Sequence, residues 1–197
     1  INSQAYRVFV LYNPTDISQA SSLGAADKKI LGNVLPTYFG AFNSNMAYKN
    51  FDLGFMFRFS GGNKINNLTR RELLSQGFNN NGTEILGRWQ SIDNPGDGWT
   101  PRLRDDRETI ININQASSRF VEKGDYIKLD NITLGYNLPK SVLDKVGLEK
   151  FRLFVQGQNL LIITDYKGLD PEMEVLGNDY NGTPRSRIFS IGLNVGF

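Results

Sequence analysis

Two pairs of carboxylates come closest to a catalytic or metal-binding arrangement in this sequence. Asp170 and Glu172 flank a proline, and a glycosidase needs two carboxyl groups that act on one glycosidic bond. The proline and the loop position favour a turn instead. Asp93 and Asp97 lie in a run that resembles the start of a calcium-binding loop. The twelfth position of that frame is Arg104, where an EF-hand requires glutamate, so a plain turn is the better interpretation.

The composition removes the commonest catalytic side chains. The 197 residues include no histidine and no cysteine. The usual general base, the Ser-His and Cys-His nucleophile pairs, thiolate metal sites and disulfides are therefore excluded. Lys and Arg number 22 and Asp and Glu number 20, so the net charge is only 22 − 20 = +2, whereas nucleic-acid binders carry a clustered basic excess. We expect no enzyme, no cofactor, no metal and no nucleic-acid partner.

Aromatic and basic residues in long polar segments are the remaining candidates for contact with a ligand. Trp89 and Trp99 flank the turn sequence at residues 93–98, and Tyr180 lies in a later segment. Flat rings stack on the apolar faces of sugars, although such residues also pack long loops together or against a lid protein. The basic residues that would bind an anionic substrate, or form salt bridges on a solvated loop, are Arg102, Arg104 and Arg107.

β-Strands with one very apolar face are the elements that must position these residues. In residues 51–60 and again in residues 189–197, large apolar side chains alternate with small or polar ones. A period of two is that of a strand, because successive side chains point to opposite faces. The residues expected on the apolar face are Phe51, Leu53, Phe55, Phe57, Phe59, Phe189, Ile191, Leu193 and Val195.

The polar face of these strands favours a membrane barrel over a soluble sandwich. Sandwich strands usually present bulky charged residues to water. Here the second face is mostly Gly, Ser and Asn, which suits the wall of a wet lumen, and no long Lys or Glu interrupts the apolar face. The mean hydropathy of −0.35 does not decide between them, because strands that alternate apolar and polar residues average to a soluble value. An extracellular glycan-binding β-sandwich is the alternative.

Four further segments fit the strand template. They are residues 6–12, 38–48, 126–136 and 151–160. In the third of them the parity of the apolar residues slips near Asp130 and Asn131, which predicts a β-bulge.

The connections between the strands alternate in length. Lys49-Asn50 forms a tight turn, and residues 138–150 contain a short helix at 141–146 that Pro139 opens. The long connections are residues 13–37, 61–124 and 161–184, and within the second of these a short helix, capped by Thr69 or a neighbour, is expected at 69–74. Short turns at one end and long loops at the other are typical of an outer-membrane barrel, and the short-turn end, with the chain end, is then periplasmic.

An ordered series of sequence pieces from about Ile30 onward resembles one family. The pieces are Leu35-Pro36, YKNFDL at 48–53, GGNK at 61–64, Arg88-Trp89, Asn94-Pro95, RFVEKGDYIKLDNITLGYNLP at 119–139, GQNL at 157–160, YKGLDPE at 166–172 and the ending at 184–197. In this order they are similar to the late barrel of SusC/RagA-type TonB-dependent outer-membrane transporters.

The resemblance implies a plugged barrel of the 22-strand class that imports oligosaccharides or, in some members, oligopeptides. It also implies a SusD-like surface lipoprotein as a lid and a TonB complex that acts through the plug. About six strands cannot close a barrel of that size, and open sheet edges are not viable in lipid. We therefore expect residues 1–197 to be a C-terminal portion of the barrel, with the plug and the earlier strands in the remaining N-terminal part of the same protein.

Aromatic residues at the short-turn end of the strands have a predicted place in the membrane. Tyr48, Tyr136 and Phe197 are expected in the periplasmic aromatic girdle, in contact with outer-membrane lipid. Phe197 also resembles the C-terminal assembly signal of barrel proteins. A barrel enzyme whose catalytic histidine lies outside this sequence stays open as a third function.

Overall fold

A computed structural model describes residues 5–9, 28–75, 80–103, 118–172 and 176–197, and the chain divides into two compact units. The sheet unit comprises Pro36–Gly62, Gly124–Asp165 and Thr183–Phe197. The loop unit comprises Ile1–Leu35, Asn63–Lys123 and Tyr166–Gly182. No helix within the described ranges is long and apolar enough to cross a membrane.

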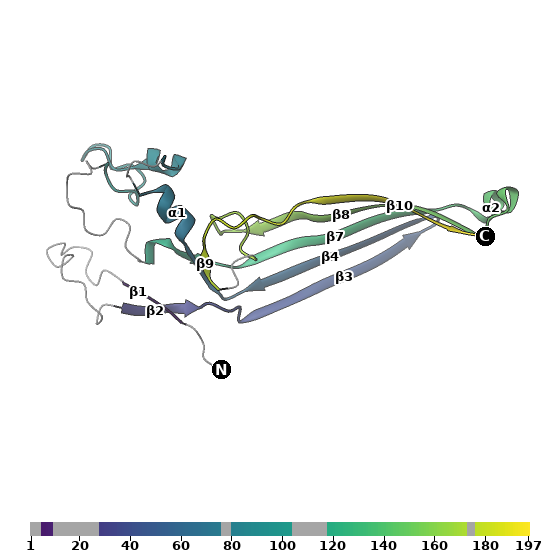
Figure 1. The fold of residues 1–197 in the computed structure, drawn as a ribbon, viewed down its shortest axis with the longest axis horizontal. Coiled ribbons are helices and arrows are strands. Elements are labelled where there is room, and N and C mark those ends of the chain that lie inside the picture. Colours follow the sequence, from purple (N-terminus) through teal and green to yellow (C-terminus); the bar gives the residue numbers. More distant parts are fainter. Residues whose placement is uncertain (1–4, 10–27, 76–79, 104–117, 173–175) are drawn as a thin grey trace. The chain divides into compact units, whose positions relative to one another are not determined.

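The sheet unit is an antiparallel sheet of five strands, in which each strand pairs with the strand of this sheet that follows it in the sequence (Figure 1). Four of its strands match the predicted segments within a residue at each end. Strand β8 runs four residues further than predicted, because it continues to pair with β7 as far as Thr164. In spatial order the strands are β3(Tyr38–Tyr48), β4(Phe51–Gly61), β7(Tyr126–Asn137), β8(Lys150–Thr164) and β10(Ile188–Gly196).

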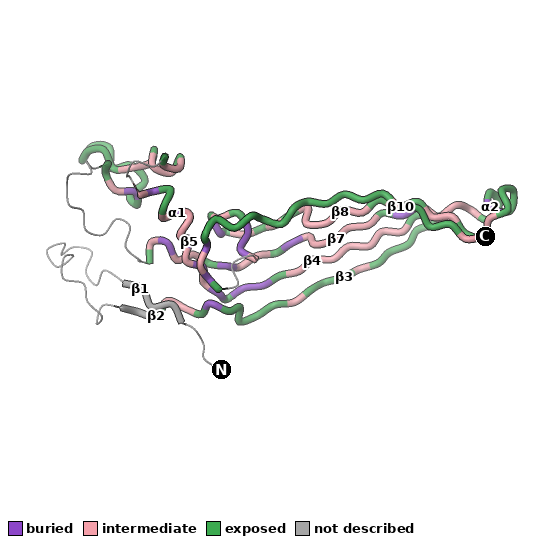
Figure 2. The backbone as a smooth tube through the Cα atoms, in the orientation of Figure 1, coloured by how far each residue is buried: buried purple, intermediate pink, exposed green. Residues whose placement is uncertain are grey.

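The register gathers the apolar side chains of all five strands on one face. Leu53 lies opposite Met46 on β3 and Leu134 on β7. Val155 on β8 in turn lies opposite Leu134 and Ile191. Much of this face is open, and Ile191 is 79% exposed. Figure 2 shows that the outer strands β3 and β10 are exposed along most of their length. An exposed apolar surface of this extent marks a face that contacts a membrane or another part of a protein.

The opposite face of the sheet is polar and is organised around an ion pair. Arg152 donates from Nη2 to Oδ2 of Asp52 at 2.5 Å and from Nε to Oδ1 at 3.0 Å. Asn137 Nδ2 donates to the same carboxylate at 2.8 Å. Gly135 lies beneath this pair, and a Cβ there would come within 2.5 Å of both partners. A larger residue at position 135 would therefore require the two side chains of the ion pair to shift.

Phe154 is a large aromatic residue on this polar face. It lies opposite Gly192 on β10, and a Cβ at position 192 would approach its ring to 2.3 Å. The Arg152 guanidinium lies 5.0 Å from the ring centroid. The absence of a side chain at Gly192 makes room for the ring.

The predicted β-bulge at Asp130 is confirmed. Met56 pairs with Asn131 and Phe57 pairs with Leu129, so Asp130 has no partner on β4. Its carboxylate accepts a hydrogen bond from Arg58 Nη2 at 2.8 Å. The extra residue reverses the parity of β7 and keeps both halves of the strand apolar on the same face.

Both predicted short connections lie at one end of the sheet, where the chain also ends (Figure 1). The turn consists of Lys49 and Asn50, with Lys49 in the left-handed region at φ 54°. The predicted short helix is present as α2(Lys140–Val146), and Pro139 occupies its N-cap position. Tyr48 and Tyr136 lie at this end of the apolar face, and the ring centroids of Phe51 and Tyr136 are 4.9 Å apart.

The three long connections contain short strands that the sequence does not predict. Strand β1(Ala5–Phe9), which overlaps the predicted strand at 6–12, pairs with β2(Lys28–Asn33), which lies within the connection predicted at 13–37. A second small sheet places β5(Lys64–Asn67) between β6(Val121–Lys123) and β9(Asn178–Asp179). These strands are too short for alternation to show in the sequence, and β5 pairs with β9 across more than 100 residues.

Helices and a small core complete the loop unit. The short helix predicted at 69–74 is confirmed as α1(Leu68–Leu73), and two 3₁₀ helices, η3(Thr83–Gly87) and η4(Ser118–Phe120), accompany it. Asn67 caps α1, because its Oδ1 accepts the Arg70 N–H at 2.8 Å. Ile65 and Phe120 are fully buried at 0% exposure, and Leu74 is buried beside them in the core of this unit.

Candidate functional site: an aromatic pocket in the loop unit

Trp89, Trp99 and Arg102, three of the predicted contact residues, line one pocket of about 430 Å³. Pro95 and Pro101 complete its walls. Trp89 is 38% exposed and Trp99 is 52% exposed, so both rings offer a face to a ligand. Proline and tryptophan together make a flat, apolar surface suited to a sugar ring or to an aromatic or proline side chain.

A single carboxylate holds the segment that carries the two tryptophans. Asp97 Oδ1 accepts the N–H of Trp99 at 2.8 Å and that of Thr100 at 2.6 Å, and Oδ2 accepts the Thr100 hydroxyl at 2.7 Å. Thr100 is buried, and its carbonyl accepts the N–H of Trp89 at 2.9 Å. Both rings are therefore fixed to one turn, which is the plain-turn interpretation of Asp93 and Asp97.

These hydrogen bonds also favour the ionised form of the Asp97 carboxylate. The backbone N–H and hydroxyl of Thr100, followed by the N–H of Trp99, lower the pKa of Asp97.

The turn requires glycine at position 96. Gly96 has φ +67°, and a Cβ there would lie 2.3 Å from the carbonyl oxygen of Gly87 and 2.4 Å from that of Arg88. The Asp97 N–H donates to the same Gly87 carbonyl at 2.7 Å. The Asn-Pro-Gly-Asp-Gly sequence thus brings residues 87–89 against residues 96–100 and sets the spacing of the two rings.

Arg119 is a residue of this site that sequence reasoning missed. Its guanidinium lies 5.2 Å from the Phe120 ring centroid and 6.0 Å from that of Trp99, which are cation–π distances. Its Nε and Nη2 are buried and hydrogen-bond to no other residue in the described part of the chain. Burial, and then the charge of Arg70, lower the pKa of Arg119. The only signal in the sequence was its position at the start of the family-like run at 119–139.

A buried ion-pair cluster joins α1 to the segment that leads to the tryptophans. Arg70 is 8% exposed, and its guanidinium donates from Nε to Glu84 Oε2 at 2.8 Å, from Nη2 to Glu84 Oε1, and from Nη1 to Glu122 Oε1 at 3.1 Å. The hydrogen bonds to Glu84 raise the pKa of Arg70, and the same bonds lower the pKa of Glu84. The cluster was not predicted, because its members lie 14 and 52 residues apart in the sequence.

The remaining predicted site residues lie elsewhere. Tyr180 is 75% exposed and does not line the aromatic pocket. Arg104 and Arg107 lie outside the described residues. Asp170 Oδ1 accepts the backbone N–H of Glu172 at 3.0 Å, which is the predicted turn.

The residues predicted to face lipid share the apolar face of the sheet, as the strand register shows. Phe197 follows β10 and is 88% exposed. Its role in assembly, and the contact of this face with lipid, stay predictions.

Curated relatives share the sequence of this chain over most of its length. TonB-dependent receptor P3 of Formosa agariphila is 38% identical over 193 residues, which cover 92% of this chain and 18% of that protein. TonB-dependent receptor SusC of Bacteroides thetaiotaomicron is 33% identical over 174 residues, which cover 86% of this chain and 16% of SusC. The chain thus spans less than a fifth of the length of these relatives. No protein-family model matches it.

Solved structures share its fold. The structure of the RagAB peptide transporter superposes with a TM-score of 0.76 at 24% identity, and the match covers 98% of this chain and 22% of the RagAB chain. The RagAB peptide importer in its closed-closed state gives a TM-score of 0.73 at 25% identity, over 89% of this chain and 19% of that one.

Proposed function

We propose that this chain, which belongs to the SusC/RagA-type TonB-dependent receptors, serves as the C-terminal portion of the transmembrane barrel of an active importer. Receptors of this family are outer-membrane β-barrel proteins. The observation that carries the proposal is the continuous apolar face of the sheet unit, on which Leu53, Leu134, Val155 and Ile191 follow one another across four strands. Lipid is the environment that such a face suits.

The two edges of the sheet support the same proposal. Among the described residues, β3 pairs only with β4, and β10 pairs only with β8. An unpaired strand edge in lipid costs several kcal/mol for each polar backbone group left without a partner. We infer that earlier strands of the same protein pair with both edges and close the barrel around a plug.

The transported cargo is proposed from the relatives and from the aromatic pocket. The solved neighbours are a peptide importer and transporter, and one curated relative is SusC. We infer import of oligosaccharides or oligopeptides, driven by a TonB complex through the plug and without catalysis. Trp89, Trp99 and Arg102 would contact either the cargo or a SusD-like surface lipoprotein that forms the lid.

The geometry of the loop unit disfavours the alternative of a soluble glycan-binding β-sandwich. A sandwich needs a second sheet that covers the apolar face of the first. Within the described ranges the other strands are β1 and β2, of five and six residues, and β5, β6 and β9, of two to four residues. Strands of this length cannot cover a face built from strands of nine to fifteen residues.

The test uses cells that produce the full-length protein and a matched strain without TonB. We expect the protein in the outer-membrane fraction, uptake of its labelled oligomer only when TonB is present, and co-purification of a surface lipoprotein. Substitution of both tryptophans by alanine should leave insertion intact and weaken either uptake or lipoprotein capture. A protein that stays soluble without detergent, or uptake that continues without TonB, would overturn the proposal.

A further inference from the structure

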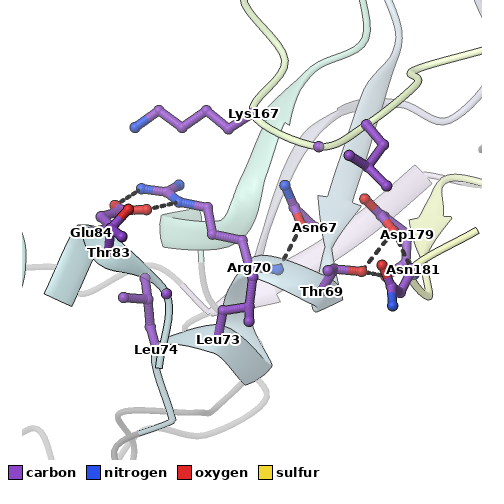
Figure 3. A pocket seen from close by; sticks show the side chains of 13 residues that line it. Asn67, Thr69, Arg70, Leu73, Leu74, Thr83, Glu84, Lys167, Asp179 and Asn181 are labelled. Atoms are coloured by element: carbon purple, nitrogen blue, oxygen red, sulfur yellow. Dashed lines mark hydrogen bonds and ion pairs between the residues drawn. The ribbon is translucent and has the colours of Figure 1, made fainter. Parts of the chain in front are cut away.

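A second cavity of the loop unit, about 290 Å³ in volume, lies between α1 and the segment that carries Lys167 and Leu169. It shares no lining residue with the aromatic pocket. In Figure 3 the Arg70–Glu84 pair and the Thr69–Asp179 hydrogen bond occupy opposite sides of the cavity, and the Lys167 side chain lies above the ion pair. A cavity near the lower end of the usual range of roughly 300–1,000 Å³ suits one residue of a longer ligand.

Two charged groups in the walls of this cavity, Asp179 and Arg70, already have partners. Asp179 accepts the Thr69 hydroxyl and the Asn181 N–H, each at 2.7 Å, and also the Tyr166 hydroxyl. The Arg70 guanidinium is occupied by Glu84 and Glu122. These groups give the cavity a rigid shape before any ligand arrives, and rigidity of this kind lowers the entropic cost of binding.

One cation at the rim has no such partner. The Lys167 ammonium makes no hydrogen bond or close ion pair with any other described residue, although, after the hydrogen bonds from Arg70, its charge also helps to lower the pKa of Glu84. Its backbone N–H donates to Glu122 Oε2 at 2.8 Å. The backbone is therefore held in place while the ammonium stays available. A single available cation beside the Glu84 carboxylate suits a ligand with one negative charge better than a doubly charged phosphate.

The apolar part of the cavity consists of leucines. Leu74 is buried at its floor, whereas Leu73 is 45% exposed and Leu169 is 63% exposed at its rim. Among the residues that the structure describes, no aromatic side chain lines this cavity, although sugar rings are commonly held by aromatic side chains. The lining thus favours an aliphatic group over a sugar.

We propose that this cavity binds the C-terminal residue of a peptide, with an aliphatic side chain on Leu73, Leu74 and Leu169 and the α-carboxylate on the Lys167 ammonium. That the bound peptide is cargo rests on the proposed import function. Of the two proposed classes of cargo, oligosaccharides and oligopeptides, the cavity favours oligopeptides, and it requires a free C-terminal carboxylate.

The test measures peptide binding to the full-length transporter, purified in detergent, by calorimetry. The probes are Ala-Ala-Ala-Leu with a free carboxylate, the same peptide as its C-terminal amide, and a glucuronic acid oligosaccharide. We expect the amide to bind about 10-fold to 100-fold more weakly, because it loses a charge-assisted hydrogen bond. The oligosaccharide carries carboxylates but no aliphatic side chain, and it should not compete with the free-acid peptide for binding.

Variants locate the effect in the cavity. Lys167→Met should weaken binding of the free-acid peptide by about 10-fold or more and leave the amide unchanged, whereas Lys167→Arg should keep the preference for the free acid. Leu169→Asn should weaken both peptides alike. Lys145→Met, at an exposed lysine of α2, is the matched control and should change nothing.

Equal binding of acid and amide, an unaffected Lys167→Met variant, or a uronate that binds as tightly as the peptide would each overturn the subsite. These outcomes differ from a failure of the import function. Uptake that depends on TonB but ignores Lys167→Met contradicts only the subsite. Peptide binding that requires Lys167, in a protein that transports nothing, supports the subsite and contradicts the import function.

Discussion

Phe55→Arg places a charge on the apolar face near the middle of β4. The Phe55 ring centroid lies 6.0 Å from that of Phe42 and 5.8 Å from that of Phe57, and Ile132 lies opposite on β7. If this face meets lipid, an arginine near the bilayer midplane costs about 2–4 kcal/mol of folding free energy. Loss of the two ring contacts, worth about 0.5–1.5 kcal/mol each, moves the expected effect toward the upper part of that range or above it.

The control for this prediction is the neighbouring residue. Met56→Gln changes the polar face, next to the cavity lined by Asn43 and Asn131, and should cost less than about 0.5 kcal/mol. Gly192 also lies on that face, but it is unsuitable as a control because the Phe154 ring covers it. The measurement is reversible denaturant unfolding of the full-length barrel in lipid vesicles. Equal losses for Phe55→Arg and Met56→Gln would mean that both faces are buried in protein, and would refute the lipid assignment.

Three further predictions concern the loop unit and the chain end. Arg70→Met leaves Glu84 and Glu122 without their buried partner and should destabilise the loop unit by about 3–5 kcal/mol. The control, Arg71→Met, breaks the pair with Glu72 and should cost under about 1 kcal/mol. Hydrogen exchange of the backbone amides of α1 measures the effect of both substitutions. The lowered pKa of Asp97 stabilises the tryptophan turn at any pH above the ordinary Asp value of about 3.9, and this contribution is lost only as the pH falls through the lower folded value. Tryptophan emission should therefore hold constant from pH 7 to about 5, and Asp97→Ala should change it at pH 7; a wild-type transition near pH 6 would contradict this account. Deletion of Phe197 should lower the amount of full-length protein in the outer membrane, and normal amounts would show that this exposed residue is not an assembly signal.

The strands of the sheet unit could be predicted because their faces differ so strongly. In β4 and β10 the alternation runs without a break, and in β7 its single slip locates the bulge at Asp130. The Lys49-Asn50 turn followed from the two-residue gap between two such strands. Alternation is a signal that neighbouring residues carry, and these strands show it because each has one face in the same apolar surroundings.

The loop unit could not be predicted from the same signal. Strand β9 has two residues, and it exists because Asn66 and Asn178 pair across a long stretch of chain. The sequence predicts only that Thr69 or a neighbour caps α1, because Asn67 and Thr69 are both good capping residues. The structure selects Asn67, since the Thr69 hydroxyl donates to Asp179 instead. Such elements are stabilised by contacts between distant segments, and spacing in the sequence does not reveal them.

The candidate binding residues also divide into those that the sequence could predict and those that it could not. Trp89, Trp99 and Arg102 were predicted by residue type and do share a pocket. The grouping of Arg119 with Trp99, and the cavity beside Lys167, depend on tertiary placement alone.

The central proposal is that the sheet unit crosses the outer membrane, with the predicted short connections in the periplasm and the predicted long connections at the cell surface. Because these 197 residues contain no cysteine, single cysteines can report on each place once any others in the full-length protein are replaced. The reagent is a charged, membrane-impermeant maleimide applied to intact cells. The account predicts labelling of Tyr180→Cys in intact cells, of Lys145→Cys only after the outer membrane is opened, and of Leu193→Cys only after unfolding. Labelling of Lys145→Cys in intact cells, or of Leu193→Cys in the folded protein, would contradict it.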